Sequence, residues 1–191
     1  MNKTPQKRKP STSRSLRRDR SGQALVEFSL AVVMLVLLVF GLIDFCTAIY
    51  EKQLLVNLSR EAANLAARGG NGLSPQQIMT NALDAIQQEA TPLSLLNSSP
   101  SGKVYLTAVT NNGATPPKFY ISEQVSSGGL SAQSKLGTGV GAQVTTLPST
   151  NLVQVGGTCY IAEVFYAYKP VVSLPIIAGL SNTFYDVAYF Q

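Results

Sequence analysis

"GQALVEFSLAVVMLVLLVFGLIDFCTAIYEKQLLVNLSREAANLAARGG", residues 22–70, predicts one long helix whose two halves differ in character. Residues 28–43 carry no charge, and because about 20 apolar residues are needed to cross a membrane, their apolar neighbours must help to span it. The second half is amphipathic, since one stripe of its surface carries Leu54, Leu58, Ala62 and Leu65. The pattern therefore predicts a membrane helix at 23–45 that continues as an amphipathic helix at 46–68 and ends at the glycine pair 69–70.

The basic residues are concentrated at the amino end of the chain. Residues 1–22 hold eight of the 15 Lys and Arg residues, and two prolines and several serines in this segment predict a flexible basic leader. Because this charge is a block beside an apolar helix, it indicates a membrane flank and not a nucleic-acid-binding surface. Lys and Arg stay in the cytoplasm, so residues 69–191 are expected to form an exported domain. A cleaved secretory signal with its site at residues 46–48 is an alternative, and Glu27 at the start of the apolar run argues against it.

Local signals predict the elements of the exported domain. Ser74, Pro75 and Gln77 form a capping box with proline at the first helical position, which predicts a short helix that ends before Pro92. Alternating apolar and polar residues predict strands at 103–110, 118–125, 152–170 and 183–190. The first two of these strands are expected to form a hairpin. Residues 126–151 are rich in Gly, Ser and Thr and predict a long exposed loop. The expected fold class is α+β, with a long N-terminal helix, one short helix and an antiparallel sheet of about four strands.

The inventory of reactive side chains argues against an enzyme. The chain has no His and no Trp, so the commonest general base and the commonest nitrogen ligand of metals are absent. Glu123, Glu163 and Asp186 show no spacing that predicts their meeting. The glycines of residues 137–142 fit a loop better than a dinucleotide site, because no strand and helix frame them. We therefore expect no catalytic, cofactor-binding or metal-binding residues.

The two cysteines lie far apart in the sequence. Cys46 falls near the outer end of the membrane helix, and Cys159 falls in a predicted strand of the exported domain. An oxidising compartment permits a disulfide between them, within or between chains, but spacing alone does not predict its geometry. Two separate buried thiols are the favoured interpretation.

Glu27 is a carboxylate just inside the apolar segment. A charge at a membrane-helix centre costs about 2.5–3.5 kcal/mol on insertion scales, and less near the interface, so an intramembrane carboxylate usually has a partner or a function. One interpretation is that Glu27 extends to the inner headgroups. The other is that cleavage after Gly22 frees the α-amino group of Gln23, which pairs with Glu27 of a neighbouring, staggered subunit.

The segment around this carboxylate resembles the processing signature of type IV pilins. "GQALVEF" places a glycine before the expected cut and a glutamate at the fifth mature position. Within that superfamily, "SGQALVEFSL…LVFGLIDFCTAIYEKQLLVNLSREAANLAA" is similar to the TadE-like minor pilins, or pseudopilins, of the tight-adherence (Flp pilus) secretion system. A weaker likeness continues in "SKLG" (134–137), "AEVFYAYKPVV" (162–172) and "GLSNTFYDVAYF" (179–190).

The resemblance implies a set of sites and partners. Gly22 and Gln23 would flank a cut made by a prepilin peptidase of the bacterial inner membrane, and Glu27 would be the assembly carboxylate. Phe28 stands where the major Flp pilins commonly carry tyrosine. The partners implied are the peptidase, other minor pilins of the system, the major Flp pilin and the inner-membrane assembly platform.

The resemblance also implies a role, which is to take part in building an Flp pilus for surface adherence and biofilm formation. The protein would be a single-pass inner-membrane protein with its N-terminus in the cytoplasm, and it would enter the extracellular pilus after processing. The alternative is a permanently anchored envelope protein that binds surfaces or scaffolds the secretion apparatus. N-terminal mapping separates the two, because only the first begins at Gln23.

Overall fold

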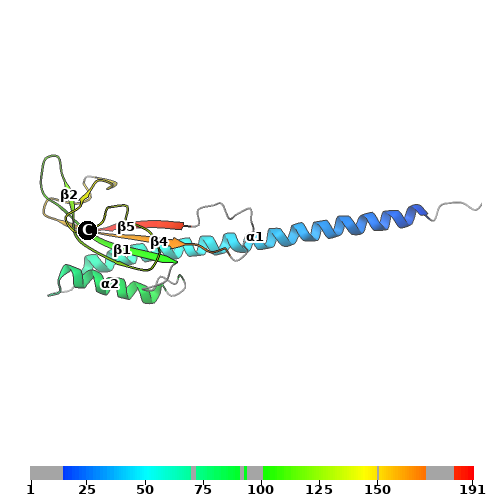
Figure 1. Ribbon diagram of the computed structural model, residues 1–191, viewed down its shortest axis with the longest axis horizontal. Helices are drawn as coiled ribbons and strands as arrows, with labels where there is room; N and C mark the ends of the chain where they lie inside the picture. Colours follow the sequence, from blue (N-terminus) through cyan, green and yellow to red (C-terminus); the bar gives the residue numbers. More distant parts are fainter. Residues whose placement is uncertain (1–14, 70–71, 91–92, 94–100, 150, 171–182) are drawn as a thin grey trace, which may run out of the picture. The chain divides into compact units, whose positions relative to one another are not determined.

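The computed structural model of the chain describes residues 15–69, 72–90, 93, 101–149, 151–170 and 183–191, with side chains from residue 22 onward (Figure 1). It contains two helices and one antiparallel sheet of five strands in the order β3-β2-β1-β4-β5. The elements are α1 (Ser15–Arg68), α2 (Pro75–Glu89), β1 (Gly102–Asn111), β2 (Phe119–Ser127), β3 (Gln143–Val144), β4 (Thr158–Ala167) and β5 (Thr183–Phe190). The predicted α+β class is confirmed.

The contacts divide the chain into two compact units, Met1–Phe45 and Cys46–Gln191. Helix α1 contributes to both. The boundary falls where the sequence pattern changes from uniformly apolar to amphipathic, so the amphipathic half of α1 belongs to the same unit as the sheet.

Helix α1 begins at Ser15 and not at Gln23, where the sequence pattern places its start. The difference has a local cause, because Leu and Arg favour helix in this stretch and no proline follows Pro10 before the apolar segment. A helix that has formed downstream extends into such a sequence at little cost. The other end agrees with the prediction: α1 ends at Arg68, and Gly69 adopts a φ of 58°, the left-handed conformation that terminates helices.

Helix α2 has the predicted cap. The Ser74 hydroxyl accepts a hydrogen bond from the backbone N–H of Gln77, and the Gln77 side chain accepts one from the backbone N–H of Ser74. Pro75 occupies the first turn, and the helix ends at Glu89, before Pro92. The face of α2 that carries Met79, Ala82, Leu83 and Ile86 is buried.

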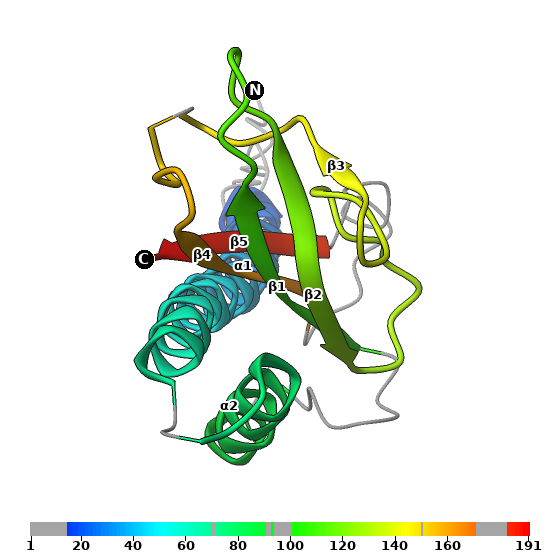
Figure 2. The same ribbon diagram turned by 90° about the vertical axis from the view of Figure 1, so that its left-hand side faces the viewer.

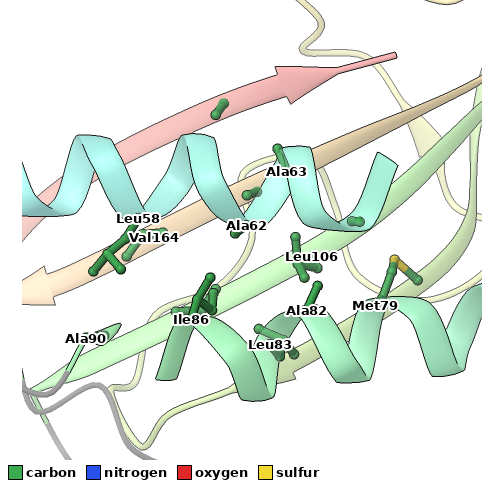
Figure 3. Close-up of a cluster of buried hydrophobic side chains, with 14 of the residues drawn as sticks. Leu58, Ala62, Ala63, Met79, Ala82, Leu83, Ile86, Ala90, Leu106 and Val164 are labelled. Carbon is green, nitrogen blue, oxygen red and sulfur yellow. The ribbon is translucent and has the colours of Figure 1, made fainter. Parts of the chain in front are cut away.

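The first hydrophobic core lies between the two helices and one face of the sheet. Leu58, Ala62 and Ala63 of α1 and the buried face of α2 meet Leu106 of β1 and Val164 of β4 (Figure 3). Helix α2 and the amphipathic half of α1 lie on this side of the sheet (Figure 2). The strands alternate as predicted, since Ala162 and Val164 of β4 face this core while Ile161 belongs to a second cluster.

The second cluster covers the opposite face of the sheet. It joins Val109, Ile121 and Ile161 of the strands to Leu136 and Val153 of the connecting segments. The prediction of an exposed loop over residues 126–151 is therefore wrong in part, because this stretch contains β3 and buried side chains. The physical reason is that the second face is apolar too and needs cover. A few apolar residues among many Gly, Ser and Thr residues supply it, and average composition does not reveal them.

Candidate functional site

The first half of α1 exposes an apolar surface along its whole length. Its large apolar side chains between residues 25 and 43 are 42–70% exposed. The most apolar 18-residue window has a mean hydropathy of 2.7, and none of it is buried. Among the described residues this is the one helix long and apolar enough to cross a membrane. The surfaces of soluble proteins rarely carry apolar patches of this extent. This N-terminal helix therefore has the character of a membrane anchor.

Glu27 is the one ionisable side chain between residues 22 and 43. Its carboxylate accepts a hydrogen bond from the side-chain amide of Gln23, with Nε2 and Oε1 3.0 Å apart. The two residues lie four positions apart, so they share one face of the helix. A hydrogen bond to a carboxylate offsets part of the cost of removing it from water, but it leaves the negative charge uncompensated.

Gly22 lies inside α1, one position before Gln23. A Cβ atom added at Gly22 would meet no other atom within 4 Å. Glycine inside a helix costs about 1 kcal/mol relative to alanine, and neither packing nor backbone conformation explains it here. Phe28, on the other side of the carboxylate, is 69% exposed. Gly22, Gln23, Glu27 and Phe28, the four residues singled out by the sequence, thus lie within seven positions on one exposed stretch of helix.

Three polar side chains join the amphipathic half of α1 to the last strand. Lys52 Nζ donates to the backbone oxygen of Tyr185 at 2.6 Å and lies 3.5 Å from Oδ1 of Asp186. The fully buried Ser59 donates to Oδ2 of Asp186 at 2.6 Å. These contacts fix α1 to β5 across 127 and 133 positions of sequence. Spacing gave no sign of them, because the partners lie more than a hundred positions apart in the sequence.

Glu163 forms a second polar cluster that sequence reasoning missed. Its carboxylate is fully buried on β4 and accepts hydrogen bonds from the Ser134 hydroxyl, the Lys135 backbone N–H at 2.9 Å and the Tyr185 hydroxyl at 3.0 Å. The Lys135 ammonium lies 3.5 Å from the centre of the Tyr185 ring. The cluster holds residues 134–136 against the sheet. It also brings together residues that lie far apart in the sequence, in the loop after β2 and in strands β4 and β5.

Glu163→Ala is expected to lower the free energy of unfolding by roughly 3 kcal/mol, because it leaves buried donors without their acceptor. Glu123→Ala, which removes a half-buried carboxylate from the neighbouring strand β2, is the control and should cost about 0.5 kcal/mol. Urea unfolding of the detergent-solubilised chain measures both. Equal effects of the two substitutions would contradict the role assigned to Glu163.

Burial raises the pKa of several tyrosines on the sheet. It raises the pKa of Tyr166 to about 12, and the Glu51 carboxylate, hydrogen-bonded to the phenol, adds to the shift. Burial also raises the pKa of Tyr105, Tyr185 and Tyr189, in each case with help from the charge of Glu163. None of the tyrosines at 160, 166, 168, 185 and 189 is exposed. These tyrosines therefore belong to a half-buried sheet.

The raised pKa values of the tyrosines predict that the fold loses stability at alkaline pH. A raised pKa in the folded chain means that the stabilisation is complete below the ordinary value of 10.0 and is lost as the pH rises through the folded value. In a spectrophotometric titration of the native chain, the phenolate absorbance of Tyr105, Tyr166, Tyr185 and Tyr189 is therefore expected above pH 10. The chain unfolded in urea should show it near pH 10, the ordinary tyrosine value. Superimposable native and unfolded titrations would contradict the burial of these phenols.

Both cysteines are free thiols in the structure. Cys159 is buried in the second cluster, as expected, and burial raises the pKa of its thiol. Cys46 is exposed, which differs from the expectation of two buried thiols. The described residues contain no group of three His, Cys, Asp or Glu side chains that could hold a metal ion.

The comparisons with known proteins bear on α1. No curated protein and no solved structure is similar enough to this chain to count as a match. Residues 22–64 match the sequence model of a family described as "TadE-like protein". The matched segment starts at Gly22, includes Gln23 and Glu27, and reaches into the amphipathic half of the helix. The resemblance recognised in the sequence is thereby confirmed over residues 22–64, which are similar to the TadE-like family.

Proposed function

We propose that this protein is a non-enzymatic minor pilin, or pseudopilin, that takes part in assembling the pilus of the tight-adherence system. The TadE-like match associates the chain with that system. The observation that carries the proposal is an exposed apolar stretch of helix, residues 22–43, in which Glu27 is the one ionisable side chain and has an uncharged amide as its described partner. Such a helix is suited to lateral packing against other helices inside a membrane or a filament.

The electrostatics of Glu27 supply the assembly mechanism. A prepilin peptidase cuts between Gly22 and Gln23, and the new amino terminus of Gln23 becomes an ammonium group at the start of the mature helix. In a staggered array this ammonium reaches Glu27 of a neighbouring subunit. The pair neutralises both charges in a medium of low dielectric, where an unpaired charge is costly. Pairing therefore favours one register between neighbouring helices.

Each compact unit has its own part in this proposal. The apolar half of α1 anchors the chain in the bacterial inner membrane, with the basic leader in the cytoplasm, and later packs against other pilins. The unit Cys46–Gln191 stays outside, with α1 fixed to β5 through Lys52, Ser59 and Asp186. Its partners are other minor pilins, the major Flp pilin and the assembly platform, and the resulting pilus serves surface adherence and biofilm formation.

One structural observation favours a second candidate function. Helix α1 runs without a break from Ser15 through Gly22, so the last part of the leader and the membrane segment form one helix. A chain that keeps this helix intact would be a permanent anchor for an envelope protein that scaffolds the secretion apparatus.

Mapping the amino terminus of the membrane-bound protein separates the two functions. The chain is expressed with and without an active prepilin peptidase, and intact mass and N-terminal sequencing are compared. We expect a start at Gln23 with the peptidase and the full basic leader without it. An intact leader in both samples would favour the permanent anchor and remove the source of the ammonium group.

A further inference from the structure

The proposed cut creates an amino terminus with an unusual chemical liability. An amino-terminal glutamine can cyclise: its neutral α-amine attacks Cδ of its own side-chain amide, the new N–Cδ bond closes a five-membered lactam, and the Cδ–Nε2 bond breaks to release ammonia. The product has no α-ammonium group, so the terminal charge is lost. Since the proposed assembly uses that charge, cyclisation of Gln23 would remove the counter-ion of a neighbour's Glu27.

The structure places the side-chain amide of Gln23 where this reaction is disfavoured. Nε2 of Gln23 donates to Oε1 of Glu27 at 3.0 Å. Glu27 lies one helical turn towards the carboxyl end, whereas the α-nitrogen of Gln23 faces the amino end of the helix. Ring closure requires the side chain to fold back onto its own nitrogen, and the hydrogen bond holds it along the helix instead.

The same hydrogen bond opposes the reaction electronically. Lactam formation expels Nε2 as ammonia, which requires this nitrogen to gain a proton. A carboxylate that accepts a hydrogen bond from Nε2–H increases the electron density on the nitrogen and strengthens its conjugation with the carbonyl. The carbonyl carbon is then a poorer electrophile, and the bond to the leaving group is harder to break.

We propose that Glu27 protects the mature amino terminus of its own chain from conversion to pyroglutamate by holding the side-chain amide of Gln23. This inference rests on the proposed cut after Gly22. It gives the carboxylate a role on its own chain that is separate from the pairing with a neighbour. The protection requires a hydrogen-bond acceptor at position 27, whereas the pairing requires a negative charge there.

This difference defines the experiment. The chain from Gln23 onward is fused to the carboxyl end of a ubiquitin-like protein and purified in detergent micelles. The protease specific for that fusion partner then exposes Gln23 as the amino terminus, so the prepilin peptidase is not needed. Intact mass measures, over time, the fraction of chains lighter by one ammonia. The set comprises the natural sequence, Glu27→Ala, Glu27→Gln and Asp84→Asn, which removes an exposed carboxylate from α2.

Glu27→Ala removes the acceptor and is expected to cyclise about fivefold faster, the effect of one ordinary hydrogen bond. Glu27→Gln keeps an acceptor oxygen and should cyclise at nearly the natural rate, although its charge is gone. Asp84→Asn should match the natural sequence. Equal rates for Glu27→Ala and the natural sequence would overturn the inference, as would a Glu27→Gln rate equal to that of Glu27→Ala. Failure of the proposed cut has a different signature, because protein from cells with the peptidase would then keep its leader.

Discussion

Glu27→Gln is expected to abolish incorporation of the protein into pili or minor-pilin complexes while leaving it inserted in the membrane. The substitution removes the negative charge but keeps the size and the hydrogen-bonding capacity of the side chain. Breaking a buried ion pair by removing one partner costs about 3 kcal/mol or more, which is roughly a hundredfold in an assembly equilibrium. Insertion should be unchanged or improved, because a charged residue opposes it. Membrane fractionation and immunodetection in sheared pili measure the two properties separately.

A variant that exchanges the two residues gives a sharper test. Gln23→Glu/Glu27→Gln keeps the composition, the hydropathy and a carboxylate–amide pair four residues apart. It moves the negative charge by four positions, about 6 Å along the helix. N-terminal mapping first verifies that the variant is cut. If Glu27 sets the register between subunits, the exchanged chain should insert but not assemble. Assembly of the exchanged chain at the natural level would contradict the pairing mechanism, and Asp84→Asn serves as the control for loss of an exposed carboxylate.

Gly22→Ala is expected to block removal of the leader without harming the fold. The helix has room for the added methyl group, since a Cβ at Gly22 would meet no atom within 4 Å. Alanine should even stabilise the helix by about 1 kcal/mol. A peptidase that holds the backbone at the cut closely would be displaced by this methyl group, and misplacement by about 1 Å can cost roughly a hundredfold in rate. Accumulation of the unprocessed chain is visible as a mass shift in the membrane fraction.

The chain offers a matched control for this substitution. Gly41 also lies inside α1, and a Cβ atom there would likewise meet nothing within 4 Å. Gly41→Ala therefore adds the same methyl group to the same helix and should be processed at the natural rate. If Gly22→Ala were also processed at that rate, Gly22 would not define the cut. If both variants failed to be processed, the defect would lie in helix packing or membrane position and not at the cut.

The sequence predicted those parts of the fold that depend on local patterns. The apolar run, the stripe on the second half of α1, the capping box at Ser74 and the alternating strands each have a cause within a few residues. The hydrogen bond between the side chains of Gln23 and Glu27 was not predicted, although a separation of four positions places two helical side chains on one face. Helix α1 begins earlier than the apolar pattern predicts, because the pattern starts only after the first turns of the helix.

The contacts that sequence reasoning missed are long-range. Glu163 binds residues 134 and 135 of a loop and Tyr185 of the next strand. Asp186 meets Lys52 and Ser59 of α1. No periodicity relates such partners, because the sheet order and the path of the covering segment decide which residues meet. A charged residue within an otherwise apolar strand is the one sign of such a contact in the sequence. It indicates that the charge has a partner, but it does not identify the partner residue.

The fastening of α1 to β5 imposes an order of events during synthesis. Strand β5 is translated more than a hundred positions after the helix that it binds. This strand supplies the carbonyl and the carboxylate that hold Lys52 and Ser59. The amphipathic half of α1 is therefore synthesised well before the strand that it packs against. Until the ribosome adds that strand, the face of the helix that it covers lacks its native cover, and transiently exposed apolar surface of this kind promotes aggregation.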